Sequence, residues 1–275
     1  MSGFALQVAL HWAAVALYAG AALAWTVSVI FDRPRLHRTA VWLVAGGLVP
    51  QSAALAIRWV TSGHGPYVTK FEVFSSDAWM IAAGTLVVLA ARPAWRAIGM
   101  VAMPAAVLLV GLAVFHDPDV HQIPPTFRSI WLVFHITFAK LAAVGFLLCT
   151  AAGVLILIDA RKRRPAWAAR FPTGPVLEAF LARSAAFGLV FWTFAIAAGS
   201  IWAHQSWGRY WGWDAIETWS LVAWLIYGAL LHARTFFRWG GTRLAWAAVG
   251  AFVLFAATAL VFPILFPTIH DGYLQ

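Results

Sequence analysis

The sequence predicts an all-α polytopic membrane protein, a bundle of about eight transmembrane helices. Of its 275 residues, 63% are hydrophobic and only 11% are charged, whereas a soluble domain carries about 25% charged residues. Apolar runs recur along the chain, and a helix needs about 20 such residues to cross the hydrocarbon core of a bilayer. This composition excludes a water-soluble fold, and we expect a single integral-membrane domain over residues 1–275.

The first four spans are expected at 4–30, 40–60, 76–91 and 97–115. The first has no basic segment before it and is long enough to cross a bilayer, so we do not expect a cleaved signal peptide. The second lies between a basic segment at 32–38 and a loop near 61–75. The third is short, and a second basic segment at 92–96 separates it from the fourth.

The last four spans are expected at 130–158, 182–204, 219–237 and 244–266. The fifth is long and follows a loop rich in His and Pro at 116–129. A strongly basic stretch, 161–183, separates it from the sixth, and a Trp-rich segment at 205–218 precedes the seventh. The single cysteine, Cys149, lies inside the fifth span and is expected to be a small core residue, since one cysteine forms neither an internal disulfide nor a CxxC motif.

Basic residues gather in alternate connecting segments. Fourteen of the 19 lysines and arginines lie in the segments near 32–38, 92–96, 161–183 and 234–243. Because Lys and Arg are retained in cytoplasmic loops, eight spans with this bias place both termini, the loops near 61–75 and 116–129, and the Trp-rich segment outside the cytoplasm. The net charge of +9 is then a topology signal that also contacts anionic lipid, and we expect no nucleic-acid binding.

The Trp-rich segment 207–219, WGRYWGWDAIETW, carries the strongest functional signal. If the segment is helical, Trp207 and Trp211 stack one turn apart, with Gly208 and Gly212 as a small-residue stripe beside them. Glycine permits close approach of a large planar ligand to the backbone, and Trp gives that ligand rigid apolar area. The alternative is an amphipathic helix whose tryptophans anchor it at the headgroup level.

The polar residues of this segment favour a ligand site over a simple anchor. Asp214 and Glu217 lie three residues apart and are expected to hydrogen-bond local donors and so fix the aromatic surface. Arg209 is placed to pair with a carboxylate. Trp213 adds a third indole to the surface.

This segment resembles the tryptophan-rich WWD signature of the haem-handling proteins of cytochrome c assembly, a superfamily that includes CcsA (also called ResC), CcmC and CcmF. Its ending, Glu217-Thr218-Trp219, is similar to the CcsA branch, whose usual pattern reads roughly WGxYWxWDPKETW. Ala215 and Ile216 replace the usual Pro-Lys, which removes one possible contact to an anion. The resemblance implies a WWD haem-binding segment over 205–219.

Two histidines are expected on the same membrane face as this segment. His135 lies near the outer end of the fifth span, and His270 lies just beyond the eighth. Neutral imidazole is a strong axial ligand for haem iron, so the pair makes a plausible bis-histidine site. Both match the positions of the outer-haem ligands in the CcsA family. His232, near the cytoplasmic end of the seventh span, matches the family's ligand to a second, intramembrane haem.

The resemblance implies a subunit of the System II haem lyase, working with haem b, a CcsB-like membrane partner and apocytochrome c. Haem meets His232 and a histidine of the partner, then passes to His135 and His270, with the porphyrin against Trp207, Trp211 and Trp213. The two thiols come from the CxxCH motif of the apocytochrome, so this chain contributes positioning and no acid/base residue. The expected location is a bacterial-type plasma membrane or a thylakoid-type membrane.

Other readings remain open at this point. A CcmC-like haem chaperone uses the same surface and paired histidines without being the lyase, and six spans would favour it. A b-type electron-transfer subunit would need facing ligand pairs within the membrane, and a transporter would need a Gly- or Pro-broken pair of spans at midplane. His64, in a Gly-His-x-Pro loop, is expected to shape a turn. His11 and His204 have no assigned role, and His116 and His121 are expected in a solvated loop.

Overall fold

The computed structural model describes residues 3–90, 92–116 and 125–260. Within these residues, eight helices are long and apolar enough to cross a membrane, and every regular element is helical. The protein is thus a multi-pass helical membrane protein, as predicted. By internal contacts the chain forms two compact units, residues 1–122 with 164–172, and residues 123–163 with 173–275. The assignment of residues 1–275 to one domain stays a prediction.

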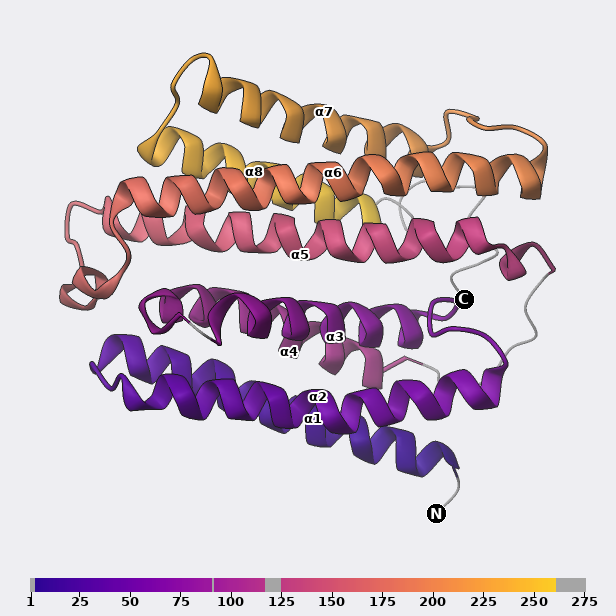
Figure 1. Ribbon diagram of the computed structural model, residues 1–275, viewed down its shortest axis with the longest axis horizontal. Helices are drawn as coiled ribbons and strands as arrows, with labels where there is room; N and C mark the ends of the chain where they lie inside the picture. Colours follow the sequence, from indigo (N-terminus) through magenta and orange to yellow (C-terminus); the bar gives the residue numbers. More distant parts are fainter. Residues whose placement is uncertain (1–2, 91, 117–124, 261–275) are drawn as a thin grey trace. The chain divides into compact units, whose positions relative to one another are not determined.

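Unit 1 is a four-helix bundle. Its helices are α1 (Gly3–Ile30), α2 (Arg35–Ser62), α3 (Lys70–Leu89) and α4 (Arg96–Val114), the last preceded by the short η1 (Pro93–Trp95). Each helix contacts the next, and α4 closes the bundle against α1, as Figure 1 shows. Short connections make neighbours antiparallel. The short η3 (Ala166–Arg170) belongs to this unit, where Arg170 donates to the carbonyls of Val29 and Ile30 at the end of α1.

Polar side chains link three helices inside unit 1. The His11 Nε2 atom lies 2.7 Å from the Ser75 hydroxyl, and Gln51 donates to the Ser75 carbonyl at 2.8 Å. The Tyr18 hydroxyl donates to the Gln51 side chain at 2.6 Å. A buried polar group that lacks a partner is costly, so these bonds select one arrangement of α1, α2 and α3. His11 is buried and bonded through both ring nitrogens, which gives it a structural role.

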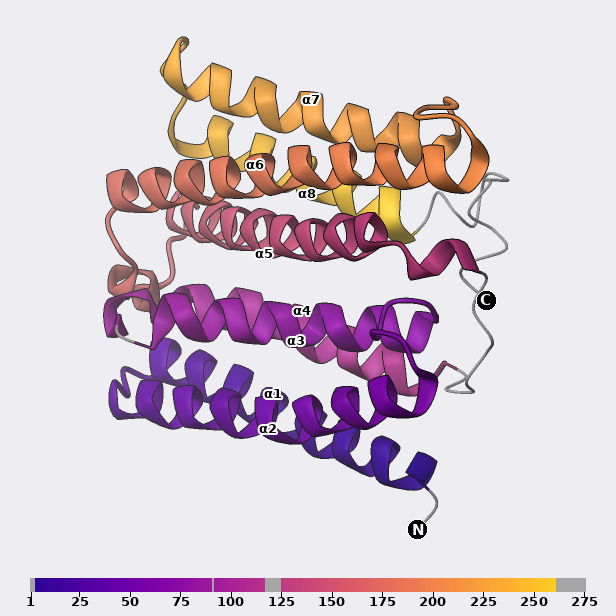
Figure 2. The same cartoon turned by 45° about the vertical axis from the view of Figure 1, so that its right-hand side comes forward.

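Unit 2 is a second four-helix bundle. It comprises η2 (Pro125–Arg128), α5 (Ile130–Asp159), α6 (Gly174–Trp207), α7 (Ala215–Thr235) and α8 (Gly241–Leu260). In the turned view of Figure 2, α5 runs beside α6, and α7 beside α8. Helices α5 and α6 approach closely where Gly145 meets Gly188, since a Cβ on Gly145 would lie 2.8 Å from the Gly188 nitrogen. Small residues permit such backbone contact between membrane helices.

The helices extend beyond several predicted span boundaries. Helix α2 begins at Arg35, α3 at Lys70 and α6 at Gly174, each five or more residues before the expected start. The first turns of α2 and α3 carry charged residues, and α6 begins with Gly174 and Pro175 and carries Glu178 in its second turn. A search for apolar runs therefore excludes these turns although they are helical. The eighth span was expected to reach residue 266, and its part beyond residue 260 lies outside the described residues.

We call the end of unit 1 that holds residues 63–69, and the end of unit 2 that holds residues 208–214, the loop end of each unit. In unit 2 this end also holds the start of α5. The Ser129 hydroxyl at that start donates to the Gln205 side chain near the end of α6 at 2.7 Å. The Trp202 indole of α6 donates to the Thr126 carbonyl at 2.9 Å. These bonds place the first turns of α5 beside the Trp-rich segment.

Candidate functional site

The Trp-rich segment contains a loop, residues 208–214, between two helices, so neither the helical stack of Trp207 on Trp211 nor the alternative of an amphipathic helix is found. We call residues 208–214 with the adjoining Trp207 the Trp-rich loop. Trp207 is the last residue of α6, and Gly208 follows in the left-handed region with φ 74°. Residues 209–214 have no regular structure, and α7 begins at Ala215. Glycine has no Cβ penalty in this conformation, and ends many helices for that reason. The tryptophans therefore lie along a turn of the chain and form no one-turn stack.

Asp214 and Glu217 hold this loop, as the sequence predicted. The Asp214 carboxylate accepts from the Glu217 amide at 2.8 Å. The Glu217 carboxylate accepts in return from the amides of Asp214 at 3.3 Å and Gly212 at 2.7 Å. This is a capping box with one additional bond into the loop. It fixes the residues around Trp213, whose φ of 59° is rare for a residue other than glycine.

The indoles of the loop form edge-to-face pairs. Trp207 contacts Trp202 of α6 at a ring distance of 5.0 Å, and Trp211 contacts Trp213 at 5.8 Å. Trp213 is 69% exposed. The buried Trp211 Nε1 atom has no hydrogen-bond partner within the described part of the chain. An unpaired indole N–H next to an exposed indole face fits a ligand that has both an apolar body and an acceptor group.

Arg209 lies within the same loop. A Cβ added to Gly212 would meet the Arg209 guanidinium, so the glycine leaves the space that this side chain occupies. Arg209 is exposed, as a residue that pairs with a ligand carboxylate has to be. His204, for which the sequence suggested no role, stacks on Tyr210 of the loop at 4.2 Å.

His135 lies in the second turn of α5, at the loop end of unit 2. Its ring is half-buried, and the Nδ1 atom lies 2.8 Å from the carbonyl oxygen of Ala195 in α6. Phe134 stacks on Phe138 at 5.9 Å, and Phe138 contacts Phe194 of α6 at 5.6 Å. The structure thus brings His135 and the Trp-rich loop to one end of one bundle. His270, the expected second ligand, lies outside the described residues, as does His121.

His232 lies in the last turn of α7, at the end opposite the loop. The helical rise of 1.5 Å per residue separates it from Ala215 by about 25 Å, so it belongs to a different site. It borders an open, mostly apolar groove of about 730 Å³ between α7 and α8, within the roughly 300–1,000 Å³ usual for small-molecule sites. The groove is lined by Trp224, Gly228, Phe237, Trp239 and Gly250, among others.

The glycines leave this groove open. A Cβ added to Gly228 or Gly250 would meet no atom within 4 Å. The exposed His232 ring stacks on Phe236 at 4.4 Å. An imidazole at the edge of a flat apolar groove fits a haem with an axial histidine. His232 is the one histidine among the described residues that line the groove.

Glu178 of α6 stabilises the turn between α7 and α8, which borders this groove. The sequence did not suggest this role. Its carboxylate accepts from the Gly241 amide at 2.6 Å and pairs with Arg234 at 3.0 Å. Arg234 also donates to the Trp239 carbonyl at 2.9 Å. The carboxylate therefore lies at the amino end of α8, where the helix dipole favours a negative charge.

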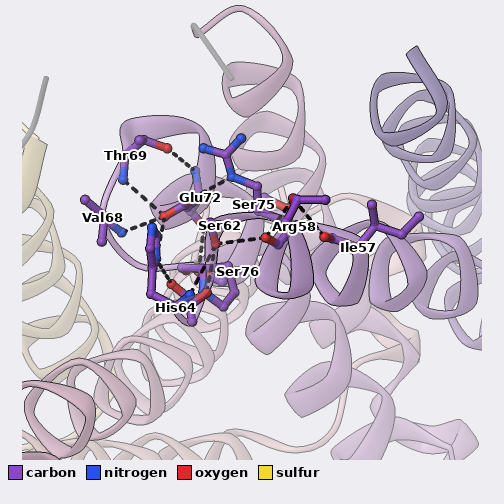
Figure 3. A network of polar contacts seen from close by, with 12 residues as sticks. Ile57, Arg58, Ser62, His64, Val68, Thr69, Glu72, Ser75 and Ser76 are labelled. Carbon is purple, nitrogen blue, oxygen red and sulfur yellow. Dashed lines mark hydrogen bonds and ion pairs between the residues drawn. The ribbon is translucent and has the colours of Figure 1, made fainter. Parts of the chain in front are cut away.

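A second polar network occupies the loop end of unit 1, and Figure 3 shows it around Glu72. The buried Arg58 guanidinium donates to the Glu72 carboxylate at 2.6 Å, and both side chains are almost fully enclosed. Glu72 also accepts from the amides of Val68 and Thr69 at 2.8 and 3.3 Å. His64 lies 4.0 Å from Glu72 and 2.8 Å from the Gly65 carbonyl, which supports its expected role in shaping the turn. Burial and the Glu72 carboxylate raise the pKa of the nearby Tyr67 phenol.

The two loops share one backbone design. Gly63 and Gly208 end their helices with φ of 73° and 74°. In both loops the N-cap residue follows six residues later, as Thr69 or Asp214, and a glutamate completes a capping box. The likeness is not apparent as a sequence repeat, because these loops match in backbone geometry and capping residues but differ in their aromatic residues.

Removing the N-cap of α7 is expected to loosen the Trp-rich loop. Asp214→Ala deletes the acceptor for the Glu217 amide, a loss worth about 1 kcal/mol for a typical N-cap. Asp214→Asn keeps an equally good N-cap and serves as the control. Hydrogen exchange of the Glu217 and Gly212 amides should become roughly fivefold faster in the alanine variant alone. Equal exchange in both variants would show that the cap does not hold the loop.

Comparison with known proteins agrees with this architecture. A family model described as "Cytochrome C assembly protein" matches residues 67–270. The cytochrome c biogenesis protein CcsA of Synechococcus sp. strain CC9605 is 30% identical over 245 residues, which cover 78% of this chain and 80% of that protein. CcsA of Synechococcus sp. strain CC9902 is 31% identical over 263 residues, with 84% of each chain covered.

The fold also matches a solved structure. The cytochrome c haem lyase CcmF superposes with a TM-score of 0.70 at 17% identity, over 97% of this chain and 49% of that chain. At this identity the likeness shows the fold alone, and the chain spans about half the length of CcmF. The family model covers well over half of this chain and the CcsA relatives align over most of their length, so the protein belongs to the cytochrome c assembly protein family.

Proposed function

We propose that this protein holds haem b at the loop end of unit 2 and presents it for attachment to apocytochrome c, as a System II haem lyase subunit. Family membership places the chain in cytochrome c biogenesis. The observation that carries the finer assignment is that His135 and the Trp-rich loop lie at the same end of one bundle. This arrangement supplies an axial ligand and an aromatic surface for the same planar substrate.

In this proposal each residue of the loop end has a separate task. His135 and His270 ligate the iron of the haem substrate, and Trp207, Trp211 and Trp213 contact the porphyrin faces. Arg209 pairs with a propionate. The capping box of Asp214 and Glu217 keeps the loop in one conformation, so little ordering is left to occur when haem binds.

The covalent step belongs to the thiols of the substrate. Each cysteine of the apocytochrome CxxCH motif adds across one haem vinyl group. A C–S bond forms, and the thiol hydrogen goes to the other vinyl carbon, so no further reactant is consumed. Cys149 is buried inside α5 and takes no part. The chain contributes orientation, which converts an encounter between two large molecules into a reaction within one complex.

His232 and its groove form the proposed entry site. Haem binds there between α7 and α8, and a CcsB-like partner subunit supplies the second axial histidine. The basic connections lie in the cytoplasm in this proposal, and both termini and the Trp-rich loop lie outside it. The membrane is a bacterial-type plasma membrane or a thylakoid-type membrane, and anionic lipid contacts the basic connections.

Replacing His232 is expected to remove the entry haem and leave the outer site intact. His232→Ala should lower the haem content of the complex purified with its partner, as counted by pyridine hemochrome, by about one haem per complex. Haem supplied from the outer side should still bind at His135, since the two sites are separated by most of the length of α7. Unchanged haem content in His232→Ala would exclude the groove as a haem site.

The test of the whole proposal is reconstitution. The chain, its CcsB-like partner and a CxxCH reporter are expressed in a bacterium that lacks its own cytochrome c maturation system. Covalent haem on the reporter, seen after denaturing electrophoresis, supports the lyase assignment. Haem on the purified complex with no covalent product would instead indicate a CcmC-like chaperone. Absence of haem from the complex would refute both.

A further inference from the structure

We propose that Gly199 is a positioning residue for the outer haem ligand, because it opens the path by which His135 reaches the backbone of α6. This inference rests on the proposed ligation of haem by His135. A Cβ added to Gly199 would lie 2.6 Å from the His135 Nδ1 atom and 2.9 Å from its Cε1 atom. Real Cβ atoms do not approach so closely, so the imidazole would have to leave the position in which it bonds to the Ala195 carbonyl.

We call the space beside Gly199 that the His135 ring occupies the notch. The hydrogen bond that His135 makes there fixes its tautomer. The Nδ1 atom lies 2.8 Å from the Ala195 carbonyl oxygen, and a carbonyl oxygen can only accept. Nδ1 therefore carries the proton, and in a neutral imidazole the lone pair then resides on Nε2. Histidines that ligate metals commonly donate their other N–H to a carbonyl in this way, which fixes the ring and makes it a better ligand.

The packing of α5 against α6 sets the notch in place. The two helices are antiparallel, and their backbones approach each other at Gly145 and Gly188. About three turns from that point toward the loop end, the same register brings His135 to Gly199. Two more turns along, Ser129 meets Gln205. One continuous interface thus ties the orientation of the His135 ring to the position of the Trp-rich loop.

Gly199→Ala separates helix stability from haem ligation. Alanine favours a helix over glycine by up to about 1 kcal/mol, so the substitution strengthens the helix while it closes the notch. In the complex purified with its partner, we expect the low-spin spectrum of the outer haem to fall at least about tenfold. Mutations of residues that support a metal ligand typically lower metal affinity by about 10- to 100-fold. Gly111→Ala is the matched control, since that glycine lies in α4 with no atom within 4 Å of an added Cβ, and its spectrum should match the wild type.

A chemical test leaves Gly199 in place and so does not depend on how Gly199→Ala folds. In His135→Gly, an added imidazole takes the place of the side chain. 4-Methylimidazole keeps an N–H for the Ala195 carbonyl, whereas 1-methylimidazole has the same size and a ligating nitrogen but no N–H. Half-restoration of the low-spin spectrum should need roughly 2- to 12-fold more 1-methylimidazole, the equivalent of one net hydrogen bond, after correction for their affinities for free haem.

The outcomes distinguish this inference from the proposed function. If His135→Gly keeps its outer haem without added ligand, the ligation by His135 is wrong. If His135→Gly loses haem but Gly199→Ala keeps a wild-type spectrum, only the positioning role of Gly199 is overturned. Equal half-restoring concentrations of the two methylimidazoles would overturn the hydrogen bond to Ala195 as a determinant of ligation.

Discussion

Replacing His135 by alanine is expected to abolish the outer haem absorbance of the purified complex and to stop cytochrome c maturation. His135 and His270 are the proposed axial ligands at the loop end of unit 2, and of these two the described residues include His135 alone. Loss of a residue that merely supports a metal ligand costs about 10- to 100-fold in affinity, and loss of the ligand itself costs at least as much. The reporter assay should therefore show less than roughly a tenth of the wild-type covalent haem.

A neighbouring histidine provides the control for this experiment. His204 lies at the same end of unit 2 and stacks on Tyr210, but it is not one of the proposed iron ligands. His204→Ala should keep its outer haem, whereas His135→Ala and His270→Ala should lose it. Wild-type spectra and wild-type maturation in both of the latter variants would refute the bis-histidine site. Loss of haem in His204→Ala alone would assign the ligand to His204 of α6 in place of His135 and His270.

The class of fold and the eight spans could be predicted because a segment that crosses the hydrocarbon core of a membrane has to be apolar along its length. An apolar run of spanning length has few alternatives to a transmembrane helix. The helix starts were harder to predict, since charged first turns such as that of α3, with Lys70 and Glu72, are helical without being apolar. The hydrogen bonds of Asp214 and Glu217 to local donors were predicted because the spacing of the two residues is local in sequence. That these bonds form the capping box of α7 was not predicted.

The remaining features depend on contacts between helices, which a single sequence does not encode in a local pattern. The glycine at 199 is one of 21 in the chain, and only the packing of α5 on α6 distinguishes it. The pairing of Arg58 with Glu72 joins two helices in the same way. Likewise, the loop form of the Trp-rich segment follows from the left-handed Gly208, a conformation that glycine permits but does not require.

The ion pair in unit 1 leads to the second large expected effect. Glu72→Gln keeps a side-chain oxygen that accepts from the amides of Val68 and Thr69, and Gln suits the capping box as well as Glu. What it removes is the negative charge beside the buried Arg58 guanidinium. Breaking a buried pair by removing one partner typically costs about 3–5 kcal/mol. We expect the unfolding temperature of the protein in detergent to fall by on the order of 10 °C.

A double variant and an exposed pair make this prediction specific. Arg58→Met with Glu72→Gln removes the unpaired charge, so it should recover most of the lost stability, since apolar replacement of a buried pair is often close to neutral. Asp32→Asn breaks the pairs of that carboxylate with Arg96 and Arg170, but Asp32 is 56% exposed, and such a pair is worth about 0–1 kcal/mol. If Glu72→Gln is as mild as Asp32→Asn, the Arg58 charge is solvated in some other way. If the double variant is as unstable as Glu72→Gln, the cost lies in the cap and not in the charge. The predicted order, a large loss, a recovery and a small loss, follows from the burial of the Arg58–Glu72 pair and the exposure of Asp32.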